Sequence, residues 1–220
     1  SHGSRDERDA IIENRRRAMA RLGLPAHVLV TCRQVHGVKI INLNGKMDPV
    51  RSVEADGLVT NQRGIALGVL TADCAPIILA DVNAGVIGSI HAGWRGALAG
   101  VIEAGIKSMV GLGAHIESIN ASIGPCIGPS SYEVGSEFAR GFAKKNRNVE
   151  TFFKPALRPG HYFFDLSGYA EMRLATCGLH GIDRCSEDTY LDADRFFSFR
   201  RSQHGGDIDY GRALSAVVLR

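Results

Sequence analysis

Short apolar runs alternate along the chain with longer segments whose apolar residues recur at helical spacing. Residues 5–24 (RDERDAIIENRRRAMARLGL) predict the first helix, because apolar residues between Ile11 and Leu22 can share one face. Acidic residues lead this segment and Gly23 can end it. The same spacing predicts three further helices, over residues 96–111, 131–145 and 167–179.

The apolar runs between these segments are short, and Gly, Asn and Asp turns bound them, which is typical of strands. The predicted strands are residues 27–35, 38–43, 57–60, 65–72, 75–82, 85–90, 118–123, 161–166, 195–201 and 213–219. No repeat, low-complexity segment or linker divides the sequence. We therefore expect a single α/β (α+β) domain over residues 1–220, with mixed sheets covered by helices.

The composition narrows the class of protein. The 220 residues carry a net charge of +3, a mild excess that fits a small anionic ligand better than a nucleic-acid surface. Five cysteines at irregular spacing argue against a disulfide framework and favour a cytoplasmic protein. No run reaches the roughly 18 apolar residues that span a bilayer. We expect no nucleic-acid or membrane partner, and a monomer.

Three apolar runs end in, or run into, a polar residue set among small neighbours. They contain His36 in RQVHG, Cys74 in TADCAP and His91 in HAGWRG. Two histidines and a cysteine at strand ends form a plausible zinc set, and three protein ligands leave a fourth position open, as in catalytic sites. Zinc there would lower the pKa of bound water to about 7. Asp73, beside the cysteine, could orient a ligand or move a proton.

Spacing alone leaves four alternatives open. Cys74 can be a buried thiol, with His36 and His91 as hydrogen-bonded loop residues. Cys74 and His91 can instead form a thiolate nucleophile activated by an imidazole. Two histidines and a cysteine also suit copper, and any metal can be purely structural. A chelator separates these cases, because a cysteine hydrolase survives it, a zinc enzyme stops and a structural site unfolds.

Anion binding is the second candidate chemistry. Arg95 is expected in the first turn of a helix, where backbone N–H groups and the helix dipole favour a phosphate. The loop 123–131 (IGPCIGPSS) can form a similar concave backbone site. Trp94, the only tryptophan, is expected to pack rather than stack on a ligand. The arginines that could reach inward as phosphate ligands are Arg15, Arg16, Arg17, Arg33, Arg200 and Arg201.

Taken in order, RQVHG, TADCAP, HAGWRG and IGPCIGPSSYEVG, with a late FFSFRR, resemble the YfiH-type laccase-domain family. Its members are also called multicopper polyphenol oxidases or purine nucleoside phosphorylases. The resemblance implies zinc, one per chain, held by His36, Cys74 and His91. It also implies that Arg15, directly after Asn14, contacts substrate or phosphate. The implied fold is a sandwich of mixed β-sheets flanked by helices, related to toxin-type cysteine deamidases.

Activities implied by the resemblance are phosphorolysis of adenosine, inosine and methylthioadenosine, and deamination of adenosine. Some members are also linked to peptidoglycan editing. The family usually carries a glycine-rich segment before the first helix, whereas this chain begins at SHGSRDE, so we expect that short N-terminal segment to be absent. Many relatives also have cysteines where this chain has Ser130 and Ser131.

The word laccase can be tested on the sequence. True multicopper oxidases hold several coppers largely through His-x-His pairs, and this chain has eight histidines without one such pair. A copper-dependent polyphenol oxidase is therefore disfavoured, although copper can bind the same three ligands. We expect a zinc-dependent purine nucleoside enzyme using Asp73, Cys74 and His91, with Arg15 and Arg95 binding phosphate. The alternative is a cysteine-type hydrolase or peptidoglycan-editing enzyme using Cys74 and His91.

Overall fold

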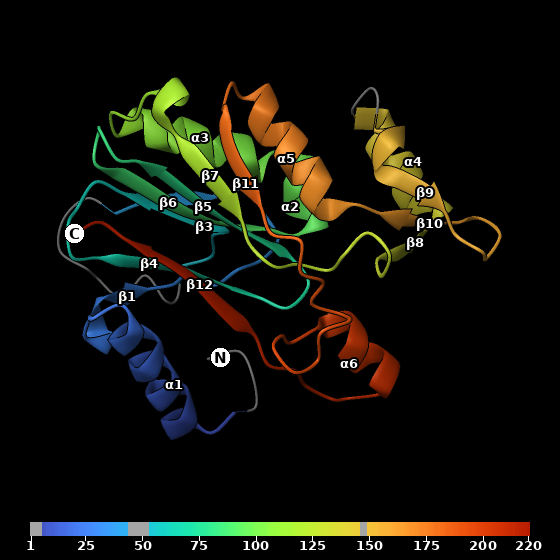
Figure 1. Ribbon diagram of the computed structural model, residues 1–220, viewed down its shortest axis with the longest axis horizontal. Helices are drawn as coiled ribbons and strands as arrows, with labels where there is room; N and C mark the ends of the chain where they lie inside the picture. The colour runs from blue at the N-terminus through green and yellow to red at the C-terminus, as the bar shows by residue number, and fades with distance from the viewer. Residues whose placement is uncertain (1–5, 44–52, 146–148) are drawn as a thin grey trace.

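The computed structural model describes residues 6–43, 53–145 and 149–220, and their strands form three sheets. The largest has the order β11-β7-β5-β6-β3-β2 (Figure 1). Its strands are β2 (Ile40–Asn42), β3 (Gly57–Thr60), β5 (Ala75–Asp81), β6 (Val86–Ala92), β7 (Asn120–Ile123) and β11 (Gly181–Arg184). The second sheet joins β1 (Leu29–Val30), β4 (Ala66–Thr71) and β12 (Ala213–Val218), and the third joins β8 (Glu133–Gly135), β10 (His161–Phe164) and β9 (Phe153–Pro155).

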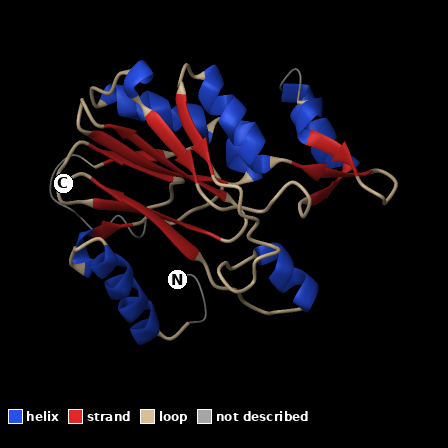
Figure 2. Ribbon diagram, in the orientation of Figure 1, coloured by secondary structure: helices blue, strands red, loops and turns tan. Residues whose placement is uncertain are grey.

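The six-stranded sheet and the β1-β4-β12 sheet form a sandwich, since β4 and β12 pack against β5 and β6. Helices α3 (Val101–Gly111) and α5 (Leu166–Thr176) cover the opposite face of the six-stranded sheet. Helix α1 (Arg8–Arg21) lies on the outer face of the β1-β4-β12 sheet (Figure 2). Both of these sheets are mixed. In the six-stranded sheet β2 runs parallel to β3, whereas β5 and β6 are antiparallel. In the other sheet β1 runs parallel to β4 and β12 runs antiparallel to it. The expected sandwich of mixed sheets flanked by helices is therefore confirmed.

Burial explains why these strands read as nearly continuous apolar runs in the sequence. Every residue of β6 is buried, because one face meets α3 and the other meets the second sheet. Leu58, Leu67 and Ile87 fill the space between the sheets, and Ile90 and Ile102 belong to the core under the helices. A strand covered on both faces cannot alternate polar and apolar residues.

Several predicted elements differ from the observed ones. The expected strand over 195–201 is wrong: residues 195–198 pair with no strand, and helix α6 (Phe199–Gly205) follows, with the Ser198 hydroxyl capping its N-terminus by accepting from Arg201 N–H. The helix expected over 96–111 is two helices, α2 (Trp94–Ala99) and α3, because Gly100 takes a left-handed conformation with φ of 103°.

Other differences concern element boundaries. The helix expected over 131–145 begins later, as α4 (Ser136–Lys145), because residues 133–135 pair as strand β8 instead. Only two residues of the strand expected over 27–35 pair with β4. The first predicted helix is confirmed as α1, although its expected start at residue 5 lies outside the described residues. No helix in the described part of the chain is long and apolar enough to cross a membrane.

Candidate metal centre

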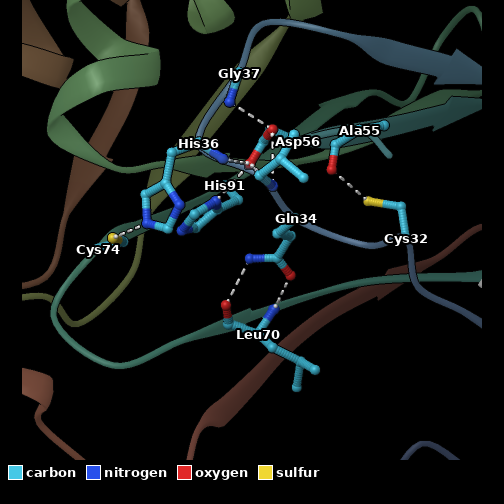
Figure 3. Close-up of polar contacts among 10 residues, drawn as sticks. Cys32, Gln34, His36, Gly37, Ala55, Asp56, Leu70, Cys74 and His91 are labelled. Carbon is cyan, nitrogen blue, oxygen red and sulfur yellow. Dashed lines mark hydrogen bonds and ion pairs between the residues drawn. The ribbon is translucent and has the colours of Figure 1, made fainter. Parts of the chain in front are cut away.

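Three side chains from separate segments meet at one end of the six-stranded sheet. His36 lies in the loop before β2, Cys74 directly precedes β5, and His91 is the sixth residue of β6. One nitrogen from each histidine and the cysteine sulfur lie within 4.8 Å of one another. The Cys74 sulfur is 3.7 Å from Nε2 of His36, and the two imidazole rings meet edge to face (Figure 3). The structure thus brings together the three side chains singled out in the sequence.

Asp56, a fully buried carboxylate, organises both histidines. Its Oδ1 lies 2.9 Å from Nδ1 of His91, so that nitrogen carries the hydrogen and Nε2 is left to bind a metal. The carboxylate also accepts the backbone N–H groups of His36 at 2.8 Å and Gly37 at 2.7 Å. One acidic side chain therefore orients the ring of one candidate ligand and the backbone of the other (Figure 3).

His36 needs this support because its backbone is strained. Its φ of 60° lies in the left-handed region, which residues other than glycine seldom adopt. A second support comes from Gln34, whose side-chain amide donates to the Leu70 carbonyl at 2.7 Å and accepts the Leu70 N–H at 2.9 Å. Gln34 thereby ties the His36 loop to β4, the strand that leads into Cys74 (Figure 3).

The turn that carries Cys74 is strained in the same way. Asp73 has a φ of 85°, and both of its carboxylate oxygens are engaged: Oδ1 accepts from the Thr189 hydroxyl at 2.8 Å and Oδ2 from the Arg200 N–H at 2.7 Å. These contacts support a positioning role, since they connect the turn before Cys74 to the C-terminal segment. Proton transfer by Asp73 stays a prediction.

The electrostatics of the centre favour a thiolate. Burial by itself would raise the pKa of the Cys74 thiol, but the charge of His91 and hydrogen bonds from both histidines lower it to about 6. Burial by itself would lower the pKa of His91, but the Cys74 thiolate and the Asp56 carboxylate raise it to about 9. For Asp56, hydrogen bonds from His91 and Gly37 N–H outweigh burial and lower the pKa.

The donor set fits a metal such as zinc. A thiolate and two imidazoles are ordinary zinc ligands, and the 3.7 Å between Cys74 Sγ and His36 Nε2 is close to the ~3.6 Å expected between two tetrahedral ligands. The backbone at Gly93 completes the cradle: a Cβ there would lie 2.6 Å from Cδ2 of His36 and 3.0 Å from the Cys74 sulfur. Only glycine leaves room for both side chains.

The predicted anion-binding residues lie in two different settings. Arg15 on α1 donates to the Leu29 carbonyl at 3.3 Å and the Thr31 hydroxyl at 3.4 Å. Arg95 is exposed at the start of α2, with its guanidinium 4.5 Å from the centre of the Trp94 ring. The Trp94 ring packs against Phe138 at 4.8 Å, which agrees with the expected packing role. Phosphate contacts by Arg15 and Arg95 stay predictions.

Asp56 and Gln34 were not singled out in the sequence as parts of the site. Asp56 had a usable signal, because it stands between Ala55 and Gly57 immediately before the apolar strand β3, where a buried charge requires a partner. Gln34 had only its place in RQVHG, two residues from His36. The partners of Asp56 are 19 to 35 positions away and that of Gln34 is 36 positions away, so the contacts are tertiary.

Comparison with known proteins places these residues in a family. The model of the family described as "Multi-copper polyphenol oxidoreductase laccase" matches residues 1–220. A Rickettsia conorii protein named a purine nucleoside phosphorylase is 35% identical over 89% of this chain and 80% of its own length. The Escherichia coli purine nucleoside phosphorylase YfiH is 35% identical over 91% of this chain and 79% of its own length.

The fold has a close counterpart among solved structures. The crystal structure of the Bacillus licheniformis hypothetical protein YfiH superposes with a TM-score of 0.91, at 25% identity, over all of this chain and 85% of that one. The sandwich and its attached third sheet are therefore a shared architecture.

Proposed function

Since the chain belongs to the YfiH-type laccase-domain family, we propose that it is a zinc-dependent purine nucleoside enzyme. Its relatives from Rickettsia conorii and Escherichia coli are named purine nucleoside phosphorylases. The reactions we assign are phosphorolysis of adenosine, inosine or methylthioadenosine, and deamination of adenosine. The substrate is a small molecule, and one metal ion serves each chain.

The observation that carries this proposal is the convergence of His36, Cys74 and His91 over one buried carboxylate, Asp56. His36, Cys74 and His91 would hold zinc with one position left open, and bound zinc would supply activation of water and polarisation of a substrate oxygen or nitrogen. Copper would bind the same donors, since it competes well at nitrogen and sulfur sites. A hydrogen bond from Nδ1 of His91 to Asp56 fixes the ring so that Nε2 faces the metal position.

The remaining residues would bind and orient the substrates. Arg15 and Arg95 would supply positive charge for phosphate, which attacks C1′ of the ribose as the bond to the purine breaks. Asp73 would hold the turn in front of Cys74 through Thr189 and Arg200, and so keep the thiolate aimed at the metal position.

A second candidate is a cysteine-type hydrolase. The observation that favours it is the lowered pKa of Cys74, about 6, beside an imidazole that is itself hydrogen-bonded to a carboxylate. Thiolate, imidazole and carboxylate in this order form the arrangement of a nucleophile, a base and an orienting group. The two candidates differ in one respect: a thiolate nucleophile works without metal.

The test is turnover of adenosine in the presence of phosphate, following inosine, adenine and ribose-1-phosphate together on protein of known metal content. We expect about one zinc per chain, product in the parent protein, and loss of both zinc and product in Cys74→Ala. Cys126→Ala is the matched control, because it removes another thiol from a neighbouring loop and should keep zinc and turnover.

Each outcome is decisive. Full zinc content and full turnover in Cys74→Ala would show that the ligand assignment is wrong. Turnover that survives complete removal of metal by a chelator, but not Cys74→Ala, would favour the cysteine hydrolase. Well-folded, zinc-loaded protein that forms none of the three products would overturn the nucleoside proposal.

A further inference from the structure

A second concave site lies outside the metal centre, between the third sheet and the C-terminal segment. It is a cavity of about 530 Å³, lined by residues of β8, β10, the loop ending in Ser130 and Ser131, and α6. None of His36, Asp56, Cys74 and His91 lines it. Its volume is within the range of small-molecule sites, roughly 300–1,000 Å³. Figure 1 shows α6 and the β8–β10–β9 sheet on the same side of the molecule.

The lining of this cavity is rich in basic groups. Arg158, His161, Arg200 and His204 line the cavity together with one acidic residue, Glu133. Arginines present several N–H donors in a planar fork that matches the oxygens of a phosphate or carboxylate. Ser130 adds a hydroxyl to the same wall, whereas the hydroxyl of Ser131 already donates to Asp188 at 2.6 Å. An anion is therefore the ligand class that this lining selects.

Several of these groups are held in place by contacts from neighbouring elements. Arg200 donates from Nη1 to the Glu133 carbonyl at 2.8 Å, and its guanidinium lies 5.3 Å from the centre of the Tyr132 ring. Nδ1 of His204 is 2.9 Å from the Tyr190 hydroxyl. His161 lies on β10 opposite Gly135 of β8, so its backbone is fixed by strand pairing. Fixed donors lose little conformational entropy when they bind a ligand.

The cavity wall is not entirely polar. Phe163 and Tyr190 present aromatic surface beside the basic groups. A free inorganic ion would leave this aromatic surface uncovered. An organic phosphate ester would place its apolar group against it. We propose that the cavity is a binding site for a small organic phosphate, a phosphate monoester whose phosphate group is held by Arg158 and Arg200 and whose organic part lies against Phe163 and Tyr190.

Arg200 connects this site to the metal centre. Its side chain lines the cavity, while its backbone N–H donates to Asp73, the residue before Cys74. The side chains of Arg158 and Glu133, by contrast, take no part in the candidate metal centre. Substitutions at Arg158 and Glu133 therefore test the cavity without changing the candidate metal ligands or their supports.

The experiment is calorimetric titration of the full chain with phenyl phosphate and, separately, inorganic phosphate. We expect phenyl phosphate to bind more tightly than inorganic phosphate. Arg158→Gln should weaken phenyl phosphate binding by about tenfold or more, since it removes a charge-assisted pair of hydrogen bonds. Glu133→Gln should strengthen it several-fold, because it removes the one negative charge among the lining residues.

Two controls make the result specific. Arg140→Gln changes the net charge equally on the exposed surface of α4, outside the cavity lining, and should leave the affinity unchanged. Cys74→Ala should also leave it unchanged, because the site does not use the metal centre. Circular dichroism confirms that each variant is folded, and the opposite sign expected for Glu133→Gln tests the site independently of Arg158→Gln.

The proposal is overturned if the folded parent protein fails to bind phenyl phosphate at millimolar concentration, or if Arg158→Gln and Arg140→Gln bind it equally well. Binding that disappears in Cys74→Ala and persists in Arg158→Gln would place the phosphate at the metal centre instead. Because binding is measured without turnover, neither result depends on the proposed nucleoside chemistry.

Discussion

Cys74 and Cys126 occupy similar places in the sequence and differ sharply in chemistry. Each lies three residues beyond the last residue of a strand, Cys74 after β4 and Cys126 after β7, and each is followed closely by a proline. Burial raises the pKa of Cys126 to about 12, whereas the histidines lower the pKa of Cys74 to about 6 in spite of burial. What separates the two loops is the set of charges that face them.

This difference distinguishes a loop of the ordinary core from the loop that carries the candidate site. Burial around the Cys126 loop makes its thiol inert, as in an ordinary core. Around the Cys74 loop, the strained backbones of His36 and Asp73 and the buried carboxylate of Asp56 hold polar groups together at a cost in stability. Such costs persist where the arrangement is used for binding or catalysis.

The largest expected effect concerns the reactivity of the two thiols. In chelator-treated protein at pH 7.5, Cys74 is mainly thiolate, because this pH lies above its pKa of about 6, and Cys126 is protonated, because its pKa is about 12. We expect iodoacetamide to label Cys74 faster than Cys126 by about a thousandfold or more, measured by peptide mass spectrometry. Added zinc should protect Cys74. Equal labelling of both thiols would remove the distinction between the loops.

A smaller effect is expected from Asp56→Asn, which weakens the support of both histidines. We expect zinc affinity, measured by competition with a chromophoric chelator, to fall by about 10–100-fold, as for other losses of a carboxylate behind a ligand histidine. Asp81→Asn is the matched control: Asp81 is equally buried and accepts backbone N–H groups from Ala84 and His115, away from the centre. Equal losses of affinity in both variants would reduce Asp56 to a structural role.

The smallest expected effect is that of one methyl group, Gly93→Ala. Its Cβ would displace His36 and the Cys74 sulfur by a few tenths of an ångström, so we expect zinc affinity to fall several-fold while the fold is retained. Gly141→Ala on α4 is the control, because a Cβ there meets nothing within 4 Å, and it should raise stability by about 0.4–1 kcal/mol. Unchanged zinc affinity in Gly93→Ala would show that the cradle is wider than its geometry indicates.

Much of the fold could be predicted from the sequence, because burial of a strand or helix face sets the local pattern of apolar residues. Strands covered on both faces appear as apolar runs, and α1 appears as a periodic pattern that ends at a glycine. The error over residues 195–201 has both a local and a tertiary cause. Phenylalanines and arginines at that spacing are compatible with a strand, but Asp73 and the Ser198 cap fix the start of α6.

The same local pattern predicted His36, Cys74 and His91, since each is a reactive side chain among small residues at the edge of an apolar run. Their residue types alone determine which metals the candidate centre can bind and which nucleophile it can offer. Only the tertiary structure decided that these three meet, that Asp56 supports two of them, and that Arg158 and Arg200 face one cavity. These contacts join residues 17 or more positions apart, and no local pattern encodes a partner that distant.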